Sequence, residues 1–207
     1  MKRRTTTLSA LAAVVLLGAG TATAVAVSDD GGSAATSTVH VKDDGVSDAR
    51  ENANEAKGAK VRAEDAIAAA LQHTPGVATG ADLDSDDGGL VWEVDIAGAK
   101  AWHHVDVDPG TGKVLGSHVE KADGDDDGDP AQVAAALRSA STSAEDAARA
   151  ASAKGTVTSV DADDDGSVRV WEAETTSANG TQQDWHVAFG SGAVTADRSA
   201  DDHGDDD

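Results

Sequence analysis

The sequence predicts an α+β protein of two tandem small modules, each made of one helix followed by an antiparallel sheet of three or four strands. Two observations predict this class. First, one ordered set of short motifs occurs twice along the 207 residues. Second, in each copy the apolar periodicity changes from that of a helix to that of a strand. Acidic segments that we expect to be disordered separate and flank the copies.

Composition limits both the size of the core and the class of partner. The chain has 38 acidic and 16 basic side chains, a formal net charge of −22, and few large apolar side chains, with four Trp, one Phe and one Met. Such a composition favours small modules over one well-packed core. The charge argues against nucleic acid and anionic membranes, which are bound through clustered Lys and Arg. Cations and basic protein surfaces are the partners that it favours.

The amino terminus has the features of an export signal. Three basic residues, Lys2 to Arg4, precede an apolar run that starts at Leu8, and Ala22-Thr23-Ala24 has the Ala-x-Ala form that signal peptidase accepts. We expect residues 1–24 to be a signal peptide and the protein to be secreted. An uncleaved anchor at the cell surface is the alternative, because the apolar run could just cross a bilayer. The chain has no cysteine, so disulfides cannot stabilise the exported modules.

Three stretches have the composition of linkers or tails. Residues 25–59 are rich in small and polar side chains, so we expect a disordered linker. Residues 121–140 begin with a run of Asp and Gly and are expected to form an acidic linker, and residues 199–207 form an acidic tail. The two modules are therefore expected over residues 60–120 and 141–198.

Three landmarks occur in the same order in both copies. The first copy contains Ala63-Glu64-Asp65-Ala66, then Asp82, Asp84, Asp86, Trp92 and Glu93, then Gly110-Thr111-Gly112-Lys113-Val114. The second contains Ala144-Glu145-Asp146-Ala147, then Asp161, Asp163, Asp165, Trp171 and Glu172, then Gly190-Ser191-Gly192-Ala193-Val194. An internal repeat of this kind predicts two copies of one fold.

The first landmark of each copy lies in an expected helix. In the first copy the apolar residues from Ala63 to Leu71 fall on one helical face, and Pro75 predicts the end of the helix. In the second copy Ser143 and Asp146 have the spacing of a capping box, which predicts the start of the helix.

The expected strands follow each helix. Leu90, Trp92, Val94 and Ile96 alternate with other residues, which is the pattern of a half-buried strand. Further strands are expected at residues 105–107, near 114–115, and at 168–175, 185–189 and 193–196.

The order of these motifs resembles the PepSY domain. The Ala-Glu-Asp-Ala-Ile helix start, the Asp-x-Asp-Asp-Gly turn, the Val-Trp-Glu-Val strand and the Gly-Thr-Gly-Lys-Val turn carry the resemblance over residues 60–120. Residues 141–198 follow it more loosely, without the Asp-Pro that begins the late turn. The resemblance implies a place outside the cytoplasm and inhibition or regulation of a secreted peptidase. It provides no catalytic residue, so we expect a protein that is not an enzyme.

The second copy also contains a complete EF-hand calcium-loop pattern. Asp161, Asp163 and Asp165 occupy alternate positions, Gly166 follows, and Glu172 stands at the twelfth position. Calcium is bound by several carboxylate oxygens in such a loop, so these four acidic residues are candidate ligands. Both flanks are expected to be strands rather than helices, however, and an Asp/Gly β-turn is the alternative interpretation.

Two functions from different classes remain. The first is a binding or regulatory protein whose partner is an exported protein or peptidase, with Trp92 and Trp171 as candidate contact residues if they lie on an open sheet face. Packing of these two side chains between sheet and helix is the alternative. The second function is an acidic cell-surface protein that binds cations, calcium in particular. The sequence leaves open whether the two modules pack together.

Overall fold

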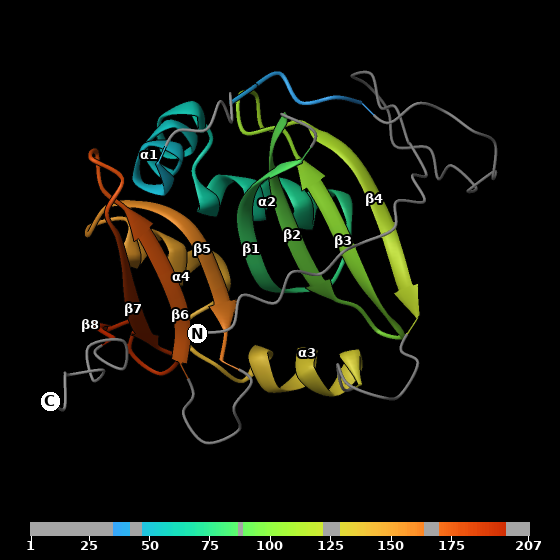
Figure 1. Ribbon diagram of the computed structural model, residues 1–207. Helices are drawn as coiled ribbons and strands as arrows, with labels where there is room; N and C mark the ends of the chain where they lie inside the picture. Colours follow the sequence, from blue (N-terminus) through green and yellow to red (C-terminus); the bar gives the residue numbers. More distant parts are fainter. Residues whose placement is uncertain (1–34, 42–46, 87–88, 122–128, 164–169, 198–207) are drawn as a thin grey trace, which may run out of the picture.

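A computed structural model describes residues 35–41, 47–86, 89–121, 129–163 and 170–197 (Figure 1). Its elements in chain order are α1 (Asp48–Gly58), α2 (Ala63–His73), β1 (Val77–Asp86), β2 (Gly89–Ala97), β3 (Ala101–Val107), β4 (Val114–Lys121), α3 (Pro130–Arg138), α4 (Ala144–Ala151), β5 (Thr156–Ala162), β6 (Val170–Thr176), β7 (Gln182–Ala188) and β8 (Val194–Ala196). The predicted signal peptide and acidic tail lie outside the described residues. Within those residues, no helix combines the length and apolarity needed to cross a membrane.

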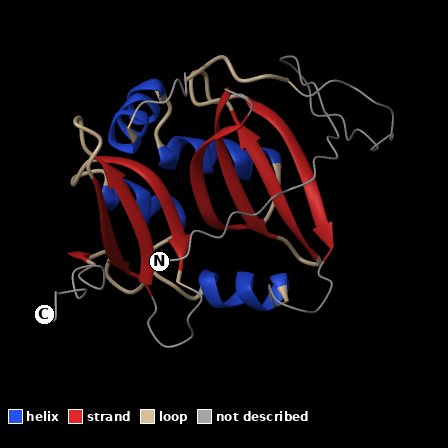
Figure 2. Cartoon of the chain, viewed as in Figure 1, coloured by secondary structure: helices blue, strands red, loops and turns tan. Residues whose placement is uncertain are grey.

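The strands form one antiparallel sheet of eight strands in the order β4-β3-β2-β1-β5-β6-β7-β8 (Figures 1 and 2). Each repeat contributes four consecutive strands, so the α+β class and the tandem arrangement of helix and strands are confirmed. The two modules do pack together, because β1 of the first pairs with β5 of the second.

The seam between β1 and β5 is short and nearly symmetric. Three residue pairs form it: Gly80 with Asp161, Ala81 with Val160, and Asp82 with Ser159. Asp82 and Asp161 are equivalent positions of the repeat, and so are Gly80 and Ser159. The central pair therefore lies on an approximate two-fold axis, and the chain resembles a symmetric dimer made within one polypeptide.

The helices α2 and α4 pack against each other on one face of this sheet (Figure 2). The predicted alternation in β2 is confirmed, since Leu90, Trp92, Val94 and Ile96 are all fully buried. The predicted end of α2 is also confirmed, because His73 is its last residue. Alanine supplies most of the helix side of the core, which lets α2 and α4 lie close to the sheet.

Trp92 and Trp171 occupy equivalent places in this core. The indole N–H of Trp92 donates to the carbonyl oxygen of Val61 at 3.0 Å, and that of Trp171 donates to the carbonyl oxygen of Thr142 at 3.0 Å. Each bond fixes the segment that precedes a helix onto the sheet. The two indoles are 0% and 1% exposed, so the expectation that they contact a partner is corrected: both face the helices rather than the open side of the sheet.

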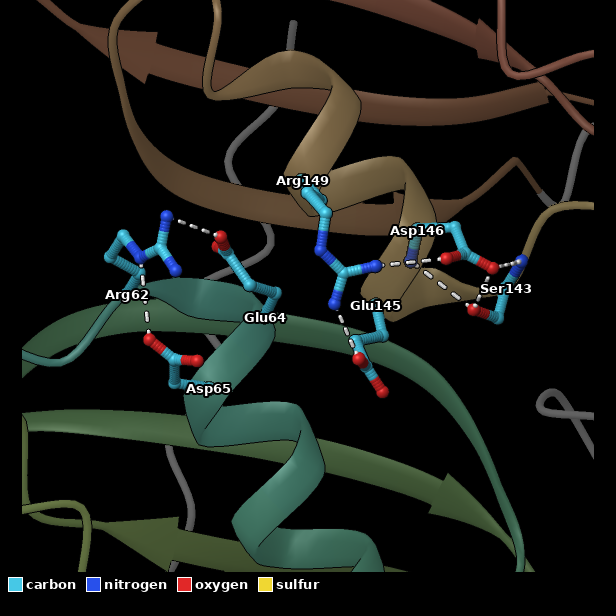
Figure 3. Close-up of polar contacts among 7 residues, drawn as sticks. All are labelled: Arg62, Glu64, Asp65, Ser143, Glu145, Asp146 and Arg149. Carbon is cyan, nitrogen blue, oxygen red and sulfur yellow. Dashed lines mark hydrogen bonds and ion pairs between the residues drawn. The ribbon is translucent and has the colours of Figure 1, made fainter.

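Figure 3 shows the polar contacts of the paired helices. The predicted capping box of α4 is confirmed, with the Ser143 hydroxyl accepting from the Asp146 backbone N–H at 3.2 Å and the Asp146 carboxylate accepting from the Ser143 N–H. Arg149 then lies 2.6 Å from Glu145 and 3.0 Å from Asp146. These contacts satisfy backbone N–H groups in the first turn of α4. They also place acidic side chains at the amino-terminal end of the helix, where the helix dipole favours negative charge.

The start of α2 differs from that of α4. Arg62 occupies the cap position, where its side chain makes no capping hydrogen bond. It instead pairs with Glu64 at 3.0 Å and with Asp65 at 3.3 Å (Figure 3). Glu64 is only 2% exposed, and the positive charge of Arg149 across the helix pair also acts on it.

Two segments that we expected to be disordered linkers are partly helical. Residues 25–59 include α1, and residues 121–140 include α3. The carboxylate of Asp129 caps α3, and Pro130 opens it. Only Ala53 of α1 is buried, which explains why the apolar pattern gave no sign of this helix. Within the described contacts, α3 packs on strands of the first module, whereas α1 reaches β5 and β6 of the second.

The short segment of residues 35–41 before α1, which we call the strap, was also expected to be disordered but makes defined hydrogen bonds to the first module. The hydroxyl of Ser37 donates to the carbonyl oxygen of Leu90 at 2.6 Å, and the Leu90 N–H donates to the carbonyl oxygen of Val39 at 2.9 Å. The buried carboxylate of Asp108 accepts from the N–H and hydroxyl of Thr38. Burial opposes ionisation of Asp108, but its hydrogen bonds from the strap and from its own turn outweigh burial and lower its pKa.

The tryptophan bonds give a stability prediction. Trp92→Phe should lower the free energy of unfolding by about 2 kcal/mol, because it leaves the partly buried Val61 carbonyl without its donor. Urea denaturation followed by circular dichroism measures this difference. Trp102→Phe is the control, since the Trp102 N–H has no hydrogen-bond partner among the described residues. Equal losses in the two variants would contradict the proposed role of the bond.

Candidate functional site

The face of the sheet opposite α2 and α4 carries the acidic side chains. Successive side chains of a strand point to opposite faces of the sheet. Because the apolar side chains face the helices, the residues between them face this side. The acidic residues placed there are Asp82, Asp84, Glu93, Asp95, Asp106, Asp161, Glu172, Glu174 and Asp184. Several stand directly opposite one another on adjacent strands, and like charges in that relation destabilise a sheet.

Part of this face is hollowed into a cavity of about 590 Å³, which we call the acidic groove. Strands of both modules line it, and α1 forms a further wall at the end where β1 and β5 separate beyond the seam (Figure 1). Its acidic lining residues are Asp48, Glu51, Glu55, Asp82, Asp84, Asp161, Glu172, Glu174, Asp184 and Asp197. No Lys or Arg is among the described residues that line it.

Two contacts hold the α1 wall in place. The hydroxyl of Ser85 in β1 donates to the carboxylate of Glu55 at 3.0 Å. At the other side, Gly180 in the turn between β6 and β7 has a φ of +86° and lies against Ala49. A Cβ atom at Gly180 would overlap the carbonyl oxygen of Ala49, so this close approach requires glycine.

The floor of the groove is also organised by hydrogen bonds. The carboxylate of Glu174 accepts from the Thr158 hydroxyl at 2.9 Å and from the Gln182 side-chain amide at 2.7 Å. Next to it on β7, burial first and then repulsion from Asp197 raise the pKa of Asp184. The two hydrogen bonds therefore hold the Glu174 carboxyl in a fixed position in the groove.

Crowding of carboxylates shifts their proton affinity at the seam. Burial, followed by repulsion from neighbouring carboxylates, raises the pKa of Asp82 to about 6. Burial and then the charge of Asp82 also raise the pKa of Asp161. Burial and repulsion, first from Asp106, raise the pKa of Glu93 to about 7. Protons or cationic groups of a partner would relieve this repulsion.

The first module carries a histidine pair on the same face. His104 Nδ1 lies 2.6 Å from Asp95 and its Nε2 lies 3.2 Å from Glu120. The hydrogen bond to Asp95 is the main cause that raises the pKa of His104. Its ring stacks on His118 with centroids 4.4 Å apart, and burial and then the charge of His104 lower the pKa of His118. Because both nitrogens of His104 face carboxylates, this ring is not placed to activate a hydroxyl nucleophile.

The structure gives the candidate calcium ligands a setting unlike an EF-hand. Asp161 and Glu172 are directly paired residues on β5 and β6, and the Asp163 N–H donates to the carbonyl oxygen of Val170 at 3.0 Å. Asp165 lies outside the described residues. An EF-hand loop joins two helices, whereas this segment joins two strands of a hairpin. In the described ranges, no group of three or more His, Asp and Glu side chains is arranged to hold a metal ion.

Fold and site together define an internally duplicated α+β protein with an acidic groove on one sheet face. The PepSY family, described as peptidase propeptide and YPEB domain, matches residues 60–118 and 142–198, which is more than half of the chain. The chain therefore belongs to the PepSY family, with two tandem copies of the domain, as the motifs predicted.

A crystal structure of a protein described as a candidate lipoprotein, from Clostridium difficile 630, is similar to this chain, with 21% identity and a TM-score of 0.43. The similarity covers 66% of this chain and 91% of that one. The comparison with curated proteins found no match.

Sequence reasoning missed the contribution of α1 to the groove. Glu51 and Glu55 are four residues apart, which places them on one side of a helix, but the segment lacks the apolar stripe that would have indicated the helix. The acidic residues near the first hairpin of the second module were singled out as metal ligands, and their actual neighbours across the seam were not visible in the sequence.

The raised pKa values predict how stability depends on pH. The folded chain keeps a proton on Asp82 up to a pH of about 6, above the ordinary value of 3.8, so between these values the folded state binds more protons than the unfolded state. The free energy of unfolding should then fall as the pH rises, by on the order of 2–3 kcal/mol between pH 4 and 7. The raised pKa of His104 acts in the same direction.

Urea denaturation at pH 5, 6, 7 and 8 measures this decline. Glu93→Gln should reduce the part of the decline above pH 6, because it removes the carboxyl that keeps its proton to about pH 7. Glu145→Gln, on the helix side of the sheet, is the control and should leave the decline unchanged. A stability that is constant or rises from pH 5 to 8 would contradict the prediction.

Proposed function

We propose that this chain is an exported, non-enzymatic PepSY protein that binds a basic, extended segment of a protein outside the cytoplasm in the acidic groove. A secreted peptidase is the class of partner that we propose, in keeping with the description of the family as a peptidase propeptide domain. Binding would then inhibit or modulate that peptidase by occupying a basic part of its surface.

The single observation that carries the proposal is the one-sided charge of the groove. Ten carboxyl groups line it and no described lining residue is Lys or Arg. An enclosed surface with one sign of charge attracts and orients the opposite charge, and such complementarity raises association rates. The groove also lies along strands and beside α1, so an extended peptide fits its form better than a compact surface does.

Export is supported by the composition of the chain and by its amino terminus. Three basic residues and an apolar run lead to an Ala-x-Ala sequence, and the remainder carries the large acidic excess. The absence of cysteine fits a fold that depends on packing between its two modules rather than on disulfides.

Calorimetric titration of the full chain with a ten-residue peptide rich in Lys and Arg tests the proposal. We expect a single saturable site whose affinity falls by about tenfold or more when salt rises from about 50 to 300 mM. Glu174→Gln combined with Asp184→Asn should weaken binding by about tenfold, because both charges belong to the groove. Mass spectrometry should recover the peptide intact, as expected of a protein that is not a peptidase.

The matched control removes two charges from the same sheet face outside the groove. Asp106→Asn combined with Glu120→Gln gives the same net charge and should leave the affinity within about twofold of the original. Equal weakening by both pairs would mean that only overall charge attracts the peptide and would contradict the proposed site. Tight binding of calcium in a parallel titration would instead favour the cation-binding function.

A further inference from the structure

The helix side of the sheet contains a second cavity, of about 310 Å³, which we call the helix-side cavity. It lies among α2, the end of α3 and the start of α4, and the beginning of β1 also lines it, so both modules contribute to its walls. Cavities that bind small molecules begin at about 300 Å³ and have mostly apolar walls. The apolar side chains of this lining are Ile67, Leu71, Val77, Ala78, Leu137, Ala140, Ala144 and Trp171.

The internal repeat does not account for this apolar lining. The equivalent positions of the second copy hold smaller or more polar residues: Ala148 for Ile67, Ser152 for Leu71 and Thr156 for Val77. Leu71 and Val77 are only partly buried and line the cavity, so the core leaves part of their apolar surface uncovered. A ligand with an apolar part would remove that surface from water, which is favourable.

A cationic side chain lines the same cavity and has no partner in the part of the chain that the structure describes. Arg138 is the last residue of α3, and its exposed guanidinium makes no hydrogen bond or ion pair with a described residue. The other polar side chains of the lining are already engaged. The Ser143 hydroxyl donates to Asp146 at 2.8 Å, and Glu145 lies 2.6 Å from Arg149. Arg138 is therefore left to pair with a ligand, and a planar guanidinium matches a carboxylate in shape and charge.

We propose that the helix-side cavity binds a medium-chain aliphatic carboxylate, with its hydrocarbon chain among the apolar side chains and its carboxylate paired with Arg138. The cavity volume corresponds to on the order of ten water molecules at about 30 Å³ each, and a methylene group takes up about as much space as a water molecule. A chain of about eight carbons therefore fits the cavity.

The acidic excess of the protein does not prevent binding of an anion at this place. The acidic groove lies on the opposite face of the sheet, and charges more than about 8 Å apart are largely screened at physiological salt when they are exposed. Glu145, the acidic residue of the cavity lining, already carries the positive charge of Arg149 beside it. Arg138 therefore determines the sign of the charge that the rim of the cavity accepts.

Calorimetric titration of the full chain with sodium octanoate tests the proposal. We expect one saturable site with a Kd on the order of 0.1 mM, which is within reach of a ligand with about ten non-hydrogen atoms. Octan-1-ol has the same chain without the charge and should bind about fivefold more weakly. Acetate has the charge without the chain and should show no saturable binding. Failure of octanoate to saturate a site, or equal affinity for octan-1-ol, would overturn the proposal.

Three variants separate the roles of the charge and of the cavity. Arg138→Gln should weaken octanoate binding by about fivefold and leave the affinity for octan-1-ol unchanged. Arg50→Gln is the matched control, because Arg50 is an exposed cation of α1 that lines neither cavity, and it should leave both affinities unchanged. Leu71→Trp fills the cavity with a larger side chain and should abolish binding of both compounds. If Leu71→Trp fails to fold, the two arginine variants still decide, and equal weakening by both would overturn the proposal.

Nuclear magnetic resonance of the full chain locates the bound octanoate. The backbone amide shifts that it changes should centre on residues 76–78, 137–140 and 144–145, and changes centred on the open face of the sheet would contradict the proposed site. Glu174→Gln combined with Asp184→Asn should leave the octanoate affinity within about twofold, because distant sites act independently. The peptide titration and the octanoate titration therefore test opposite faces of the sheet, and failure of either proposal can be recognised separately.

Discussion

The pairing of β1 with β5 is the constraint on which the rest of this structure depends. Each module has one short helix rich in alanine, and a single helix of that kind buries little apolar surface. Joining the two sheets edge to edge brings α2 and α4 together and gives the alanine faces a common core with Trp92 and Trp171. It also removes one exposed strand edge from each module, which would otherwise be open to pairing with other chains.

The same pairing makes the two faces of the sheet unlike each other. The helix side is apolar and closely packed, and the opposite side collects acidic residues that alternate with the core positions. Duplication places equivalent acids, Asp82 and Asp161, on either side of the approximate two-fold axis, where they meet. Charge crowding at the centre of the face is thus a consequence of the repeat itself. The groove is asymmetric because α1 forms a wall on one side of that axis.

Much of the fold could be predicted because its signals are local. Apolar alternation in β2, the proline after α2 and the Ser143 capping box each specify structure within a few residues, and the repeat applies the same assignment to both halves. The helix α1 was not predicted, because it buries only Ala53 and is held by Ser85 and Gly180 from distant segments. The candidate site was located only in part. Asp161 and Glu172 were singled out, but their pairing across strands depends on the register of the sheet, which short motifs do not determine.

The packing of α1 has a consequence for the order in which the molecule can be assembled. The helix belongs to the beginning of the first module, yet it rests against the turn that contains Gly180, near the end of the second. A chain that is synthesised from its amino terminus presents α1 long before its site of attachment exists. The groove can therefore be completed only after nearly the whole polypeptide has been delivered. This order delays completion of the groove until both modules have folded together.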